Sequence, residues 1–214
     1  KFGLDSLNAH GIGPWHAHRT YRKLVFAHIE RDSALVLRYS IDLAHYLADL
    51  HVPLHTTANY NGQFSNQSGI HALWETQIPE AFQDGFALHP RKNQLNCAYM
   101  GDIEHHIWER TLESYAESHY VFECELQVRD CWGTEPIDAY IQRGRTRQLM
   151  RTPEFVNAYH QALNGQVEQQ MLKSIHSVSA WWYSARIDAG QTPLPSTTIP
   201  NKRTWKTTRD WLLQ

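Results

Sequence analysis

The 214 residues include 20 Lys and Arg, 22 Asp and Glu and 14 His, which gives a formal net charge of −2. Hydrophobic residues make up 42% of the chain, enough to form the core of one globular domain. The near-neutral charge and the lack of a basic run exclude strong nonspecific attraction to nucleic acid, so we expect no stable nucleic-acid complex.

The first two predicted helices cover residues 14–31 and 33–51. The first carries apolar residues at helical spacing, and we expect it to pack against the second. The second contains no Gly or Pro and is apolar at most positions, which predicts a helix buried on nearly all sides. Its polar residues form one narrow stripe: Arg38, Asp42, His45 and Asp49. Because buried charges need compensation, this stripe predicts partners from protein, water or metal.

A histidine-rich segment follows this helix. A proline ends the helix, and His55 begins a loop rich in Asn, Gly, Gln and Ser. A further helix then carries His71 and Glu75 four residues apart, on one face. With His55, these side chains offer three ligands and an open position, the arrangement of a catalytic rather than a structural zinc. His45 and Asp49 form a second half-site, and two metals in one cleft suit displacement at phosphorus.

The rest of the chain is predicted as helices joined by loops, without strands. Helices are expected over residues 100–128 and 153–189, the latter either bent or divided at Asn164 and Gly165. Residues 81–97 are predicted as a loop and 133–144 as a connection. We therefore expect an all-α fold over residues 1–190, a single multi-helix bundle around a buried metal-binding helix. Residues 191–214 are predicted to form an extended tail.

The cysteines Cys97, Cys124 and Cys131 are odd in number and lack the spacing of a metal site. Cys124 and Cys131 would lie about 10 Å apart along a helix, too far for a disulfide unless the helix ends between them. Their disulfide status and the oligomeric state stay open. The sequence contains no apolar run of about 18 residues and no signal peptide, so no transmembrane segment is expected.

Two runs, HYLADLHVPLH at residues 45–55 and GIHALWE at 69–75, resemble a signature of the zinc-dependent phospholipase C and single-strand-specific nuclease superfamily. That signature is H-Y-L-G-D-x-[HN]-Q-P-[LM]-H, then H-x-x-[WY]-[DE], and the chain departs from it at Ala48 and Val52. The resemblance implies one zinc on His45 and Asp49, with Asp49 also bridging to a third metal, and another zinc on His55, His71 and Glu75. His51 matches a position that the phospholipase branch fills with Asn, and we do not count it as a ligand.

The resemblance implies a zinc-dependent phosphoric ester hydrolase that binds up to three Zn²⁺. The first hypothesis is a phosphodiesterase of the phospholipase C type, with Asp49 as a catalytic residue and a metal-activated hydroxide attacking phosphorus in a phospholipid. The alternatives are a single-strand nuclease or 3′-nucleotidase with the same metals, and a non-catalytic zinc-binding helical module. Asn61 and Asn66 are candidate substrate contacts, and ordinary loop chemistry explains them equally well. The resemblance also implies export, to the periplasm, the cell surface or the medium.

Members of this superfamily bind further metal through an N-terminal Trp, an Asp and His residues ahead of the signature. None of these ligands has a clear counterpart in this chain, where Asp5, His10, His16, His18 and His28 precede the second predicted helix. We expect that an upstream segment of the family is missing, and that without it the chain hydrolyses phosphodiesters poorly. Alternatively, His10, His16 or His18 has taken over the role, or part of the site has been lost. For His16 and His18, a surface or capping role is favoured.

Overall fold

The computed structural model describes residues 11–88, 98–191 and 193–194. Its helices are α2 (Gly13–Ile29), α3 (Ser33–Asp49), α4 (Ile70–Ala72), α5 (Ile78–Phe82), α6 (Ile103–Cys131), α7 (Pro153–Ala162) and α8 (Gln166–Asp188). The turns η1 (Pro53–Thr56) and η3 (Gln83–Gly85) are 3₁₀-helical, and η2 (Leu73–Gln77) is π-helical. The strands β1 (Asp138–Arg143) and β2 (Thr146–Arg151) pair as an antiparallel hairpin. The prediction of a mostly helical protein is confirmed.

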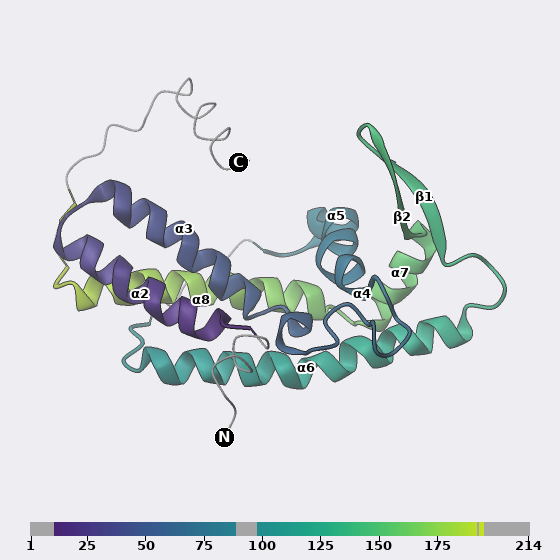
Figure 1. Ribbon diagram of the computed structural model, residues 1–214, viewed down its shortest axis with the longest axis horizontal. Helices are drawn as coiled ribbons and strands as arrows, with labels where there is room; N and C mark the ends of the chain where they lie inside the picture. The colour runs from purple at the N-terminus through teal and green to yellow at the C-terminus, as the bar shows by residue number, and fades with distance from the viewer. Residues whose placement is uncertain (1–10, 89–97, 192, 195–214) are drawn as a thin grey trace.

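Helix α6 runs along the length of the molecule (Figure 1). At one end α2, α3 and α8 pack on one another, and at the other end α6 contacts η1 and α7. Each end has its own cluster of buried apolar side chains. The first includes Leu24, Leu43, Leu47 and Trp181, and the second includes Leu54, Ile70, Leu73, Phe155 and Tyr159. The segment from residue 50 to residue 69 joins the two ends.

The predicted packing of the first two helices is confirmed. Pro14 lies in the first turn of α2, where a missing backbone N–H costs no hydrogen bond. Asp32 caps α3, because its carboxylate accepts hydrogen bonds of 3.0 Å from the backbone N–H groups of Ala34 and Leu35. Contacts between α2 and α3 bury Leu24 against the first cluster.

The prediction that the second helix is buried on nearly all sides is wrong. Leu37 and Ile41 of α3 are 63% and 55% exposed. The polar stripe also faces solvent, since the side chains of Arg38 and His45 are 66% and 70% exposed. Only one face of α3 packs, through Val36, Leu43 and Leu47. Apolar composition shows that a helix can be buried, but the number of neighbouring elements decides how much of it is.

The prediction of a chain without strands is also wrong. Residues 138–151 form the β1–β2 hairpin, in which Arg143 lies opposite Thr146 across a two-residue turn. Gly144 has φ +60 in this turn, a conformation that favours glycine. Each strand has only six residues, and the hairpin contains four arginines rather than a run of β-branched or aromatic residues. The signal for strands was therefore weak.

Two open questions about the carboxyl-terminal half are resolved. Residues 153–189 form two helices, because Asn164 and Gly165 both have positive φ and break the chain between α7 and α8. Helix α6 is continuous through Cys124 and Cys131, and both thiols are free. Cys97 and residues 195–214 of the predicted tail lie outside the described residues. Within the described part, each helix is too short or too polar to span a bilayer.

The loop between η1 and α4 requires glycine at position 62. A Cβ there would lie 2.4 Å from the carbonyl oxygen of Gln67, whereas a Cβ on Gly144 would meet open space. Both glycines have positive φ, which costs an alanine about 1–2 kcal/mol. We therefore expect Gly62→Ala to lower the free energy of unfolding, measured in urea, by clearly more than Gly144→Ala. Equal losses would contradict the close packing of this loop.

Candidate metal centre

The structure brings together the three side chains that the sequence analysis assigned to one zinc. His55 comes from η1, His71 from α4 and Glu75 from η2. Their ligand atoms form a small triangle: His55 Nε2 to His71 Nε2 is 2.9 Å, His71 Nε2 to Glu75 Oε2 is 2.8 Å, and His55 Nε2 to Glu75 Oε2 is 3.2 Å. The side chains are 28%, 31% and 38% exposed, so solvent reaches the centre.

This triangle fits a zinc ion. Zinc binds imidazole nitrogen and carboxylate oxygen at about 2.0–2.2 Å, which in tetrahedral geometry separates the ligand atoms by roughly 3.3 Å. The three observed separations, 2.8–3.2 Å, are shorter than this by a few tenths of an ångström. One ion thus reaches all three atoms with only small side-chain adjustments, and one tetrahedral position stays free for solvent or substrate.

The donor pattern also favours a cation. Glu75 Oε2 lies within hydrogen-bonding range of both Nε2 atoms, but if both imidazoles donated to it, two N–H groups would face each other across 2.9 Å. At least one Nε2 must therefore direct a lone pair into the centre. A metal ion satisfies all three atoms at once, because each then acts as a lone-pair donor.

A local irregularity in the helix carries Glu75. Residues 70–82 form one helical segment whose middle, η2, is π-helical, and Ile78 N–H bonds to the carbonyl of Leu73, five residues back. Pro79 explains this widening, because its ring has no N–H and clashes with the carbonyl four residues earlier, that of Glu75. Single π-turns inside helices are frequent at functional sites. The sequence pattern predicts the helix but not this distortion.

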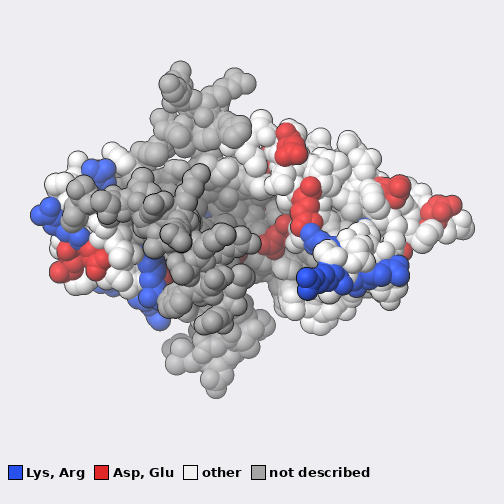
Figure 2. All heavy atoms as spheres, turned by 90° about the horizontal axis from the view of Figure 1, so that it is seen from above, with Lys and Arg blue, Asp and Glu red and all other residues white. Residues whose placement is uncertain are grey.

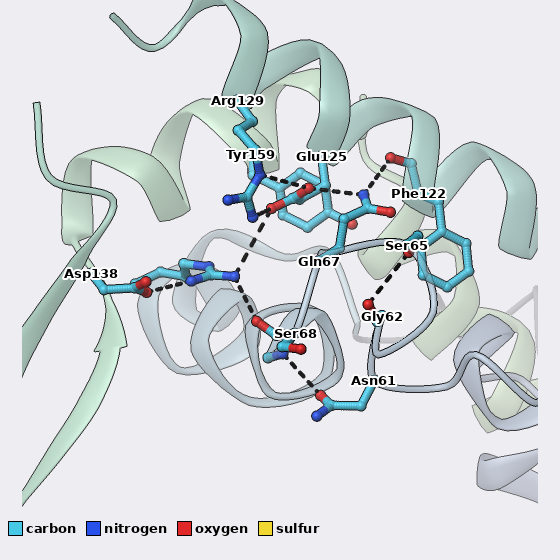
Figure 3. A network of polar contacts seen from close by, with 12 residues as sticks. Asn61, Gly62, Ser65, Gln67, Ser68, Phe122, Glu125, Arg129, Asp138 and Tyr159 are labelled. Carbon is cyan, nitrogen blue, oxygen red and sulfur yellow. Dashed lines mark hydrogen bonds and ion pairs between the residues drawn. The ribbon is translucent and has the colours of Figure 1, made fainter. Parts of the chain in front are cut away.

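The loop that leads into this helix is tied to α6 through a buried carboxylate (Figure 3). Glu125 is fully buried and pairs with Arg129. Gln67 Nε2 donates to Glu125 Oε2 at 2.8 Å and to the carbonyl of Phe122 at 2.9 Å. Arg151 of β2 lies 4.0 Å from Glu125 and donates to the carbonyl of Ser68 at 2.7 Å. These contacts fix the chain immediately before the helix that carries the metal ligands.

The two asparagines predicted as substrate contacts differ in their surroundings. The Asn61 carbonyl and side-chain Oδ1 both accept a hydrogen bond from Gly69 N–H, each at 3.1 Å. Asn61 therefore helps to place Gly69, whose φ of +92 starts the helix. Asn66 is exposed and has φ +59, a conformation that asparagine tolerates in loops. The contact with a substrate stays a prediction for both residues.

Asp49 lies beside the metal centre, on the far side of the His55 ring. Its Oδ1 is 3.6 Å from His55 Nδ1, the nitrogen that faces away from the triangle, and its Oδ2 is 3.5 Å from His45 Nε2. A carboxylate in this position typically orients a metal-binding histidine. The proximity of His45 and Asp49 agrees with the predicted half-site, although no third ligand joins them among the described residues.

The charges around the centre shift two pKa values. Burial alone would lower the pKa of His55, but its hydrogen bond to Glu75 and the charges of Glu75 and Asp49 outweigh burial and raise it above 6.5. The imidazoles of His55 and His71, both within hydrogen-bonding range of Glu75, hold the pKa of its carboxyl well below 4.5. Glu75 is therefore ionised at neutral pH, as a metal ligand must be.

The other histidines and the Asp5 carboxylate considered in the sequence are not among the three ligands of the triangle. His51 is 3% exposed, and its Nε2 is 2.8 Å from the hydroxyl of Ser177 on α8. Burial lowers the pKa of His51 to about 4, so it is a neutral core residue and is not part of the triangle. The His16 ring contacts Tyr46, which also contacts His45. Asp5 and His10 lie outside the described residues.

Sequence reasoning missed the residues that hold the centre in place, namely Gln67, Glu125 and Arg151. Glu125 lies in an α6 stretch with other charged residues, so nothing in its spacing marks it as buried. Comparison of the chain with protein-family models, curated proteins and solved structures found no match. The resemblance noted in the two sequence runs thus has no independent support from these comparisons.

We expect the purified chain to bind zinc at this centre. His71→Ala and Glu75→Gln each remove one ligand and should weaken zinc binding by more than about 100-fold, beyond the usual effect of losing a residue that only orients a ligand. Elemental analysis after dialysis measures the bound zinc. His105→Ala, on the exposed start of α6, is the matched control and should leave zinc unchanged. Unchanged zinc in the first two variants contradicts the assignment.

Zinc should stabilise the protein more as pH rises. In metal-free protein, protonated His55 contributes stability below its unfolded pKa of 6.5, and this contribution is lost as pH rises through the raised folded pKa. Zinc needs the neutral imidazole, so its contribution increases over the same interval. We expect the Tm difference between zinc-loaded and chelator-treated protein to widen from about pH 5.5 to about pH 8.5. A constant difference contradicts His55 as a ligand.

Proposed function

We propose that this protein is a zinc-dependent phosphodiester hydrolase of the phospholipase C type, exported from the cell. The observation that carries the proposal is the triangle of His55, His71 and Glu75, whose ligand atoms lie within 3.2 Å of one another. Three protein ligands with an open position are typical of catalytic zinc, whereas structural sites use four. The resemblance of residues 45–55 and 69–75 to the phospholipase C and nuclease signature supports the same chemistry.

The residues of the centre have distinct roles in this proposal. His55, His71 and Glu75 would hold one zinc, and His45 with Asp49 supply two ligands of a second. When bound, zinc supplies a Lewis acid that polarises a phosphoryl oxygen and lowers the pKa of a water molecule. Asp49 places a negative charge 3.6 Å from His55 Nδ1, which favours a proton on that nitrogen and leaves the lone pair of Nε2 for the centre.

The surroundings of the centre suit a substrate that arrives from solvent. The three ligand side chains are partly exposed, and the Tyr60 ring meets the His71 ring edge-on at 6.0 Å between centroids. Tyr60 is 52% exposed, and the neighbouring Phe64 is 76% exposed. The exposed Tyr60 ring beside the centre offers an apolar contact for the organic part of a phosphodiester.

The test is hydrolysis of bis-p-nitrophenyl phosphate by the zinc-loaded chain. His71→Ala should abolish turnover. Asp49→Asn keeps the shape of the side chain and removes its charge. Because Asp49 would also bind the second zinc, the variant should lower turnover by about 10- to 100-fold, more than it weakens zinc binding at His55, His71 and Glu75. His105→Ala should retain both zinc and turnover. Turnover that survives in His71→Ala, or an Asp49→Asn variant that loses zinc and activity equally, contradicts these roles.

The preferred substrate class is tested in the same preparation. A p-nitrophenyl ester of phosphocholine reports the phospholipase C type, and single-stranded DNA reports the nuclease type. Faster hydrolysis of the phosphocholine ester is the expected result. Preference for DNA would favour the nuclease alternative, and zinc binding without turnover of either substrate would favour the non-catalytic module.

A further inference from the structure

The β1–β2 hairpin concentrates positive charge in a chain whose net charge is −2. Residues 138–151 contain Arg143, Arg145, Arg147 and Arg151 against a single acidic residue, Asp138. Arg143 pairs with Glu80, and Arg151 with Asp138. Arg145 and Arg147 are exposed, and neither has an acidic partner among the described residues. Figure 2 shows a band of blue side chains on the right-hand half of the molecule, where the hairpin of Figure 1 points toward the viewer; red side chains lie near it, and other blue ones lie on the left-hand half.

The outer face of the hairpin adds an apolar contact to this charge. Tyr140 lies opposite Leu149 in the strand register, and Gln142 lies opposite Arg147, so these four side chains share a face. Tyr140 and Leu149 are 64% and 60% exposed. The Arg147 guanidinium lies 5.5 Å from the centre of the Tyr140 ring. The face therefore presents an aromatic and an aliphatic side chain next to unpaired cations.

The hairpin is held beside the helix of the metal centre. At its base, Arg151 donates to the carbonyl of Ser68, at the start of that helix. Near its tip, Arg143 pairs with Glu80 on α5, the continuation of the helix that carries Glu75. The hairpin and this helix together line a cavity of about 610 Å³, whose walls include Ala72, Thr76, Leu149 and Met150. On the other face of the strands Tyr140 and Arg147 are exposed, and Leu149 is 60% exposed at the edge of this cavity.

We propose that the outer face of the hairpin docks onto an anionic phospholipid surface. An arginine near such a surface contributes roughly 1 kcal/mol, about a fivefold change in affinity, while Tyr and Leu enter the interfacial region. Single-stranded nucleic acid fits less well, because its bases need aromatic platforms and the hairpin offers only Tyr140, which Arg147 already contacts. The inference deepens the proposed function and rests on it for the substrate: docking brings the protein to a surface that carries lipid phosphodiesters.

The test is sedimentation of the full chain with phosphatidylcholine vesicles, with and without about 30% phosphatidylserine as the anionic lipid. We expect binding to the anionic vesicles that weakens as salt screens the charges. Arg145→Gln with Arg147→Gln should weaken it by about 25-fold, fivefold for each charge. Leu149→Ser should weaken binding without removing its dependence on salt. The control, Arg19→Gln with Arg22→Gln on exposed α2 positions, makes the same change in net charge and should bind as the unmodified chain does.

Zinc content and hydrolysis of soluble bis-p-nitrophenyl phosphate are measured on the same variants. Both should be unchanged in the hairpin variants, because docking and metal binding use different residues. Vesicle binding that is absent, or that the double arginine variant retains, overturns the docking proposal even if hydrolysis is found. Tighter binding to a single-stranded oligonucleotide, lost in the same variant, overturns it in favour of nucleic acid. Vesicle binding with the expected losses but no hydrolysis supports docking and contradicts the proposed function alone.

Discussion

The buried carboxylate of Glu125 is the constraint on which the metal centre depends. A charge that is fully removed from water must be paired, and removing one partner of such a pair typically costs about 3–5 kcal/mol. Its partners come from three parts of the chain: Arg129 from its own helix, Gln67 from the loop before α4, and Arg151 from β2. Satisfying one carboxylate therefore brings a loop and a strand to one position on α6.

The arrangement explains how a loop rich in polar residues holds a precise geometry. Gln67 and Ser68 are fixed from α6 and β2, and Asn61 closes the loop onto Gly69. The helix therefore starts at a defined place, and His71 meets His55 at 2.9 Å. Loops generally leave their side chains more freedom than this, so ligands placed on one need such support.

The same network relates the metal centre to the hairpin. Arg151 contacts both Glu125 and the carbonyl of Ser68, so β2 and the start of the metal-binding helix share one guanidinium. Arg143 and Glu80 link the two elements again farther along. A surface bound by the hairpin would thus have a defined orientation relative to the triangle. The contacts of Arg143 and Arg151 thus hold the proposed docking face and the proposed catalytic centre at fixed positions relative to each other.

Local patterns in the sequence by themselves determined the helices around residues 13–49, 103–131 and 153–188, and the placement of His71 and Glu75 on one helical face. Spacing of four residues places side chains on one helical face whatever surrounds the helix. The tertiary structure alone decided that α3 packs on a single face, that the arginine-rich residues 138–151 form strands, and that Glu125 is buried. It also decided the approach of His55, 16 residues before His71. These features depend on contacts between distant segments, whose free energies no local spacing encodes.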